Sequence, residues 1–164
     1  MIKFVFDTNI LLDYMGCSAS QEDQDNAVAL ISALAKQHVP FLVTPTTLKD
    51  FSYILGSQIK KQIREEKGSV SAQDAAVVQR YLEGTLESVI EFGTVASESL
   101  AHCEMARTLC KQHTDYEDNL IAAVALSADA TAIVTRDKAF AKHCPVKCCT
   151  PAEALEYLEL GIWK

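Results

Sequence analysis

The chain lacks any apolar run close to the roughly 20 residues that a membrane-spanning helix needs. The segment Met1 to Phe4 also lacks the long apolar stretch and small-residue cleavage site of a secretory signal. The 164 residues are 49% hydrophobic with a mean hydropathy of +0.06, a composition that excludes a disordered chain. We therefore expect one globular domain over residues 1–164, with no membrane segment, located in the cytoplasm.

No CxxC pair is present, although the chain contains six cysteines. The one grouping of histidine with cysteine is His143-Cys144 followed by Cys148-Cys149, and its spacing matches no common structural zinc motif. A domain of this size buries enough of a core to fold without disulfides. Free thiols are the favoured interpretation, and a zinc site is the minor alternative.

An excess of positive charge is also missing, because 22 acidic residues outnumber 15 lysines and arginines and give a net charge of −7. Such a protein does not attract nucleic acid through its net charge. This objection weakens if several acids bind a metal ion, because the cation reverses the local electrostatic field.

Strand and helix patterns alternate along the chain, without repeats or low-complexity linkers. Apolar runs predict strands at residues 2–6, 41–44, 93–96, 132–135 and 146–149. Because helices separate these strands, we expect parallel pairing and an α/β fold, a three-layer α/β/α sandwich around a central, mainly parallel sheet. The two helices over roughly 46–91 are longer than a crossover requires and are predicted to form an arm.

Acidic residues stand near strand ends and helix starts at Asp7, Asp50, Asp118 and Asp137. In open α/β sheets, ligands gather beyond the carboxyl ends of the strands. Each acid alone has a simpler role as a helix cap or a solvated residue. Two charges about 5 Å apart, however, repel by roughly 3 kcal/mol, so converging carboxylates need a cation or raised pKa values. Oxygen ligands of this kind suit Mg²⁺ or Mn²⁺ and not zinc.

Three segments in this order resemble the PIN domain family: residues 5–13 (VFDTNILLD), residues 115–123 (DYEDNLIAA), and residues 134–137 (VTRD) followed by Phe140. The resemblance covers essentially the whole chain, with residues 47–50 (TLKD) in their usual place. It implies a PIN-like fold and a nuclease that uses one or two Mg²⁺ or Mn²⁺ ions to hydrolyse RNA phosphodiester bonds. The family includes the toxins of VapBC-type toxin–antitoxin pairs.

Carried over residue by residue, the resemblance makes Asp7, Asp118 and Asp137 the metal ligands. Asp115 lies one helical turn before Asp118 and is a further ligand, a hydrogen-bond acceptor or a helix cap. Asp50 stands where many members have glutamate, so its shorter side chain implies a water-mediated contact. Whichever of Asp50 and Asp115 does not bind metal is a candidate to orient or deprotonate the attacking water.

Supporting roles fall to Asn9 as the polar neighbour of Asp7, and to Thr8 and Thr135 as hydrogen-bonding groups. Asp13 is predicted to be structural. Candidate RNA contacts are the basic residues Lys60, Lys61, Arg64 and Arg136, although a charge run on a helix is more often a solvated face. Ordinary surface positions are predicted for His102, His113 and His143.

Two alternatives remain beside the ribonuclease. A non-catalytic PIN scaffold that binds RNA or a partner protein is favoured by the departure of Asp50 from glutamate. A phosphotransferase of the haloacid dehalogenase type also begins with an aspartate at a strand end, but it typically needs a second aspartate where this chain has Asn9. Candidate partners are RNA, an antitoxin protein and a second copy of the chain.

Overall fold

A computed structural model describes residues 2–18 and 20–162, and within them five short strands form one parallel sheet. The strands are β1 (Phe4–Phe6), β2 (Leu42–Val43), β3 (Thr94–Val95), β4 (Ala132–Val134) and β5 (Cys148–Cys149). Their order across the sheet is β3-β2-β1-β4-β5, and every neighbouring pair is parallel. The central position of β1 places its carboxyl end beside that of β4.

Helices occupy the connections between the strands. They are α1 (Thr8–Tyr14), α2 (Gln21–Lys36), α3 (Pro45–Lys67), α4 (Ala72–Phe92), α5 (Leu100–Leu109), α6 (Tyr116–Ser127), α7 (Lys138–His143) and α8 (Pro151–Leu160). Proline is the first residue of both α3 and α8, a position that its fixed φ suits.

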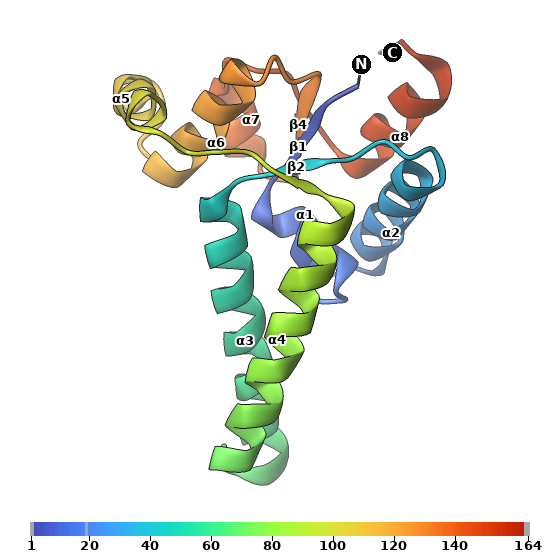
Figure 1. Cartoon of the computed structure of the whole chain (residues 1–164), viewed down its shortest axis with the longest axis vertical. Helices are drawn as coiled ribbons and strands as arrows, with labels where there is room; N and C mark the ends of the chain where they lie inside the picture. The colour runs from blue at the N-terminus through green and yellow to red at the C-terminus, as the bar shows by residue number, and fades with distance from the viewer. Residues whose placement is uncertain (1, 19, 163–164) are drawn as a thin grey trace.

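Alternate residues along the strands face opposite sides of the sheet. Phe4 and Phe6 of β1 belong to a core with α1, α2, α8, the first part of α3, and Val78, Leu82 and Val89 from the middle and end of α4. Val5 and Ile133 point the other way and pack against α6 and α7. Figure 1 shows α2 and α8 on one side of the sheet and α5, α6 and α7 on the other. The predicted three-layer α/β/α sandwich is confirmed.

Helices α3 and α4 run side by side and project away from the sheet (Figure 1). They pack closely because Gly56 is buried on α3, where an added Cβ would lie 2.9 Å from Leu82 Cδ1 of α4. Gly68 ends α3 with a φ of +82°, a left-handed conformation that favours glycine. Ser71 and Asp74 then form a capping box that starts α4.

No helix in the described part of the chain is both long and apolar enough to cross a membrane.

Candidate functional site

Asp7 lies at the carboxyl end of β1 and caps α1. Its Oδ1 accepts a hydrogen bond from the Thr8 backbone N–H at 2.6 Å. Its Oδ2 accepts two more, from Asn9 Nδ2 at 2.5 Å and from Thr135 Oγ1 at 2.6 Å. The three predicted supporting residues therefore all contact this carboxylate, which is nearly fully buried. The network fixes the orientation of Asp7 at the sheet edge.

Asp137 follows β4 on the adjacent strand end. Its backbone N–H donates to Thr135 Oγ1 at 3.0 Å, so the same hydroxyl contacts both Asp7 and the residue that carries this second acid. Asp137 Oδ1 accepts from the backbone N–H groups of Ala139 at 2.7 Å and Phe140 at 2.9 Å, which caps α7. The side chain is exposed beside a cavity of about 370 Å³ at the ends of β4 and β5.

Asp118 lies in the first turn of α6, which Asp115 caps. Asp115 Oδ1 accepts from the backbone N–H groups of Glu117 at 2.9 Å and Asp118 at 3.3 Å, so its carboxylate has the capping role considered for it. Asp118 Oδ2 lies 2.8 Å from Nε2 of His113. The expectation that His113 is an ordinary surface residue is wrong, because its side chain is 16% exposed and contacts a predicted metal ligand.

The acids at this edge influence one another electrostatically. Burial raises the pKa of Asp118 to about 6, against a lowering by the His113 hydrogen bond, with further increases from Asp115 and Asp7. Burial also raises the pKa of Asp7, and the hydrogen bonds from Thr135, Thr8 and Asn9 oppose that rise while Asp137 adds to it. Asp7 therefore interacts with both Asp118 and Asp137, although α6 and β4 are far from β1 in sequence.

Asp50 occupies a different electrostatic setting on α3. Its Oδ1 pairs with Lys49 Nζ at 3.0 Å, and the same ammonium contacts Glu117 Oε1 at 3.1 Å. Lys49 thus links α3 to the start of α6, one residue before Asp118. Asp50 is not among the largest contributors to the pKa of Asp7 or Asp118.

Arg136 forms ion pairs within the protein. Its Nε and Nη2 both bind the Asp13 carboxylate, the latter at 2.8 Å, and its Nη1 lies 3.3 Å from Asp23 of α2. The Asp13 side chain is fully buried, which agrees with the structural role predicted for it. The Arg136 backbone N–H also donates to Asn9 Oδ1 at 3.2 Å. The loop after β4 is therefore tied to both α1 and α2, and the predicted RNA contact of Arg136 stays a prediction.

The remaining predicted RNA contacts, Lys60, Lys61 and Arg64, lie farther along α3. At a rise of 1.5 Å per residue, Lys60 is about 15 Å along the helix axis from Asp50. Lys61 is 3.9 Å from Glu65 one turn later, a long and exposed pair that leaves its ammonium accessible to solvent. The structure therefore places these charges on the arm and not among the acids.

A divalent cation fits the donor chemistry of the strand-end acids. Asp7 interacts unfavourably with both Asp118 and Asp137, and no ion pair among the described residues gives any of the three a lysine or arginine partner. Across residues 2–18 and 20–162, no three histidine, cysteine or acidic side chains surround one point as a closed cage. Mg²⁺ does not require such a cage, because it commonly binds one or two carboxylates and keeps several waters.

The six cysteines are not among the predicted metal ligands. All six are free thiols. Cys148 lines the cavity beside Asp137, and a hydrogen bond between the thiols of Cys148 and Cys144 lowers the pKa of Cys144. Since no metal cage exists among the described residues, the zinc alternative gains no support from the arrangement of these groups.

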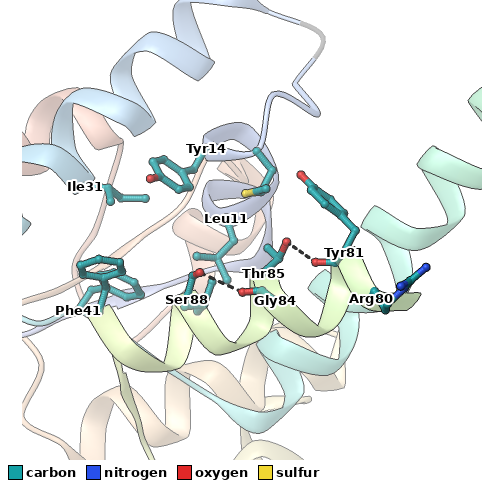
Figure 2. Close-up of a pocket in the computed structure, with 12 residues that line it drawn as sticks. Leu11, Tyr14, Ile31, Phe41, Arg80, Tyr81, Gly84, Thr85 and Ser88 are labelled. Carbon is teal, nitrogen blue, oxygen red and sulfur yellow. Dashed lines mark hydrogen bonds between the residues drawn. The ribbon is translucent and has the colours of Figure 1, made fainter. Parts of the chain in front are cut away.

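A second hollow, of about 560 Å³, lies between α1, α2 and α4 and contains none of the predicted site residues. Figure 2 shows Leu11 and Tyr14 of α1, Ile31 of α2 and Phe41 facing it, with Tyr81 and Gly84 on α4. The lining is mostly apolar, and Tyr14 and Tyr81 are both more than 40% exposed. Sequence periodicity does not reveal this hollow, because it depends on how three helices meet.

Comparisons with known proteins agree on the family and the fold. A family model described as PIN domain matches residues 3–139. No protein of curated function shows a significant sequence match to the chain. Among solved structures, VapBC2 from Rickettsia felis bound to a DNA fragment from its promoter matches with a TM-score of 0.61 and 17% identity, covering 91% of this chain and 98% of that one.

Two further structures have the same fold. FitAcB from Neisseria gonorrhoeae matches with a TM-score of 0.61 and 16% identity, covering 90% of this chain and 97% of that chain. PAE2754 from Pyrobaculum aerophilum matches with a TM-score of 0.63 and 16% identity, covering 96% of this chain and 90% of that chain.

Proposed function

The chain belongs to the PIN domain family, and from this premise we propose that it is a divalent-metal-dependent endoribonuclease. One observation carries the proposal. Asp7, Asp118 and Asp137 come from three separate elements, yet Asp7 raises the pKa of Asp118 and Asp137 raises that of Asp7. No lysine or arginine in the described structure pairs with any of the three, and His113 is the one basic side chain paired with Asp118 there. Carboxylates held this close respond with raised pKa values in the metal-free protein, and a bound cation would offset the same repulsion.

Asp7, Asp118 and Asp137 would hold Mg²⁺ or Mn²⁺. The bound cation would act as a Lewis acid toward the scissile phosphate and its leaving oxygen. Thr135 and Asn9 keep the Asp7 carboxylate oriented through their hydrogen bonds, so little reorganisation is needed when substrate arrives. Asp50, which pairs with Lys49 and not with the Asp7 network, would orient the attacking water or accept its proton.

RNA binding would combine this site with the arm. Lys60, Lys61 and Arg64 are available on α3, and phosphate contacts by lysine and arginine provide affinity without reading sequence. Positive charge concentrated on one helix offsets the net charge of −7 locally.

We further propose that the protein is a toxin restrained by an antitoxin in the cytoplasm. The fold neighbours VapBC2 and FitAcB support this assignment. The apolar hollow between α1, α2 and α4 is suited to an apolar segment of such a partner, because exposed tyrosines beside a concave apolar surface are typical of protein-binding sites. A homodimer formed through the same surface is the other candidate assembly.

The non-catalytic scaffold remains the second candidate, because Asp50 pairs with Lys49 and no closed acid cage exists among the described residues. Incubation of purified protein with structured and unstructured RNAs at low salt, in Mn²⁺ or Mg²⁺, separates the two. If the protein is a nuclease, it cleaves RNA in the presence of the metal ion, and EDTA stops the cleavage. The Asp7→Asn variant should then be less active by orders of magnitude. RNA or partner binding without metal-dependent cleavage would favour the scaffold, and cleavage that survives Asp7→Asn would indicate a contaminant.

A further inference from the structure

His113 is fixed in one orientation by contacts on several sides. Its Nε2 is 2.8 Å from Asp118 Oδ2, and its ring stacks on Phe140 with centroids 6.0 Å apart and an interplanar angle of 26°. Phe140 is itself buried against the sheet, in the same core as Val5. The imidazole therefore lies between the core and the carboxylate, with little freedom to rotate.

The backbone of the same residue is held as well. Asn119 is buried on α6, and its Nδ2 donates to the His113 carbonyl at 2.7 Å. The same amide contacts Cys110 Sγ at 3.3 Å, at the end of α5. The loop between α5 and α6, which carries His113, is thus anchored to the helix that carries Asp118.

The hydrogen bond assigns different roles to the two oxygens of Asp118. An ionised carboxylate only accepts, so when Asp118 is ionised its bond with His113 requires the proton on Nε2, which donates the hydrogen bond to Oδ2. No hydrogen bond among the described residues uses Oδ1. A carboxylate with one oxygen occupied by a fixed donor presents the other in a defined direction, and hydrogen bonds to metal-ligating carboxylates commonly control their affinity.

We propose that His113 is a positioning residue that orients Asp118 so that Oδ1 is the oxygen available to the divalent cation. This inference rests on the proposed function, since it concerns the same cation. The donated hydrogen bond carries the effect, and not the volume of the ring. A donor of similar reach should therefore preserve metal binding, whereas an apolar side chain of similar size should not.

The experiment measures the Kd of Mn²⁺ by isothermal titration on protein freed of metal with chelator. His113→Leu removes the donor and keeps an apolar contact with Phe140, whereas His113→Gln retains an N–H near the position of Nε2. His143→Leu is the matched control, because His143 is exposed and its ring stacks 6.2 Å from that of His113 without touching Asp118. We expect Mn²⁺ binding about 10- to 100-fold weaker in His113→Leu, and near wild type in His113→Gln and His143→Leu.

A second measurement does not depend on any variant folding. In wild-type protein, the imidazole ¹⁵N resonances of His113 should shift on titration with diamagnetic Mg²⁺, while those of His143 stay in place. Equal Mn²⁺ affinity in wild type and folded His113→Leu, with Asp118→Asn impaired, would overturn the positioning role and leave the proposed function intact. Unchanged His113 resonances at saturating Mg²⁺ would overturn it too. Failure of wild type to bind either ion would remove the proposed function and this inference together.

Discussion

Thr135 Oγ1 donates a 2.6 Å hydrogen bond to Asp7 Oδ2 across 128 residues of sequence. The contact exists because β1 and β4 are parallel neighbours in register, Phe6 opposite Val134, so the next residue on each strand faces the same edge. Both side chains are buried. The Thr135 hydroxyl therefore offsets part of the loss of hydration that the buried Asp7 carboxylate undergoes.

Replacing Thr135 with valine should destabilise the metal-free protein by roughly 1–3 kcal/mol, because a buried charged acceptor loses a donor without a change in side-chain volume. Thr135→Ser keeps the hydroxyl and should lose much less. Urea denaturation in chelator measures both variants. Equal losses in the valine and serine variants would show that the methyl group matters and the hydrogen bond does not.

Protonation of Asp118 gives the metal-free protein a predictable pH dependence. The pKa of Asp118 is raised from 3.8 to about 6 in the fold, so the folded state binds the proton more strongly than the unfolded state between these values. Stability should therefore rise as pH falls from about 6 to about 4, and be lowest above pH 6.

Asp118→Asn removes this charge, and in chelator at pH 7 it should be at least as stable as wild type. We expect a gain of roughly 1–2 kcal/mol, less than the pKa difference alone implies, because the side chain is partly solvated. The difference between variant and wild type should shrink toward pH 4. A loss of several kcal/mol at pH 7 would make Asp118 a structural residue.

The sheet and its helices could be predicted because the signals are local. Residues 4–6 and 132–134 are buried throughout, as short continuous apolar runs predict for strands of a parallel sheet covered on both faces, and prolines and caps mark the helix starts. The convergence of Asp7 with Asp137 follows from parallel pairing alone, since both stand at strand ends.

The contacts around the acids could not be predicted in the same way. The bond from His113 to Asp118 depends on the path of the loop between α5 and α6, which has no periodicity to indicate it. The link from Lys49 to Glu117 depends on how α3 meets α6. The bidentate pair of Arg136 with Asp13 joins residues 123 positions apart, and neither residue type identifies its partner.

The apolar hollow offers a direct test of a protein partner. Gly84 lines it on α4, and a Cβ added there meets no atom within 4 Å. Gly84→Trp should fill the hollow and abolish co-purification with a small protein encoded immediately upstream. Gly84→Ala should retain the complex and stabilise the helix by about 0.5–1 kcal/mol. A complex that survives Gly84→Trp would place the partner on another surface.

Neutralising Lys60, Lys61 and Arg64 together should weaken binding of single-stranded RNA and flatten its salt dependence. Each lost phosphate contact lowers the slope of log K against log salt by about 0.7, so three contacts lower it by about 2. Lys67→Gln is the control on the same helix, because its ammonium is already paired with Asp74 at 2.7 Å. Fluorescence anisotropy at several salt concentrations measures the slope of log K against log salt. An unchanged slope in the triple variant would mean that Lys60, Lys61 and Arg64 form a solvated face of α3 and do not contact RNA.

Asp50 should act on the reaction and not on metal affinity. It pairs with Lys49 and is not among the largest contributors to the pKa of Asp7 or Asp118, so we predict that it orients water rather than binding the cation directly. Asp50→Asn should lower kcat by roughly 10²- to 10⁴-fold while the Kd of Mn²⁺ stays within about twofold. Asp118→Asn should instead weaken Mn²⁺ binding strongly.

The variant Asp50→Glu is a second test of the same role. Glutamate is the residue common in the family at this position, and the variant should retain activity because the carboxylate is kept. If Asp50→Asn weakens Mn²⁺ binding as much as Asp118→Asn does, Asp50 is a metal ligand. Glu117 and Asp115 would then be the candidates for the acid that orients or deprotonates the attacking water.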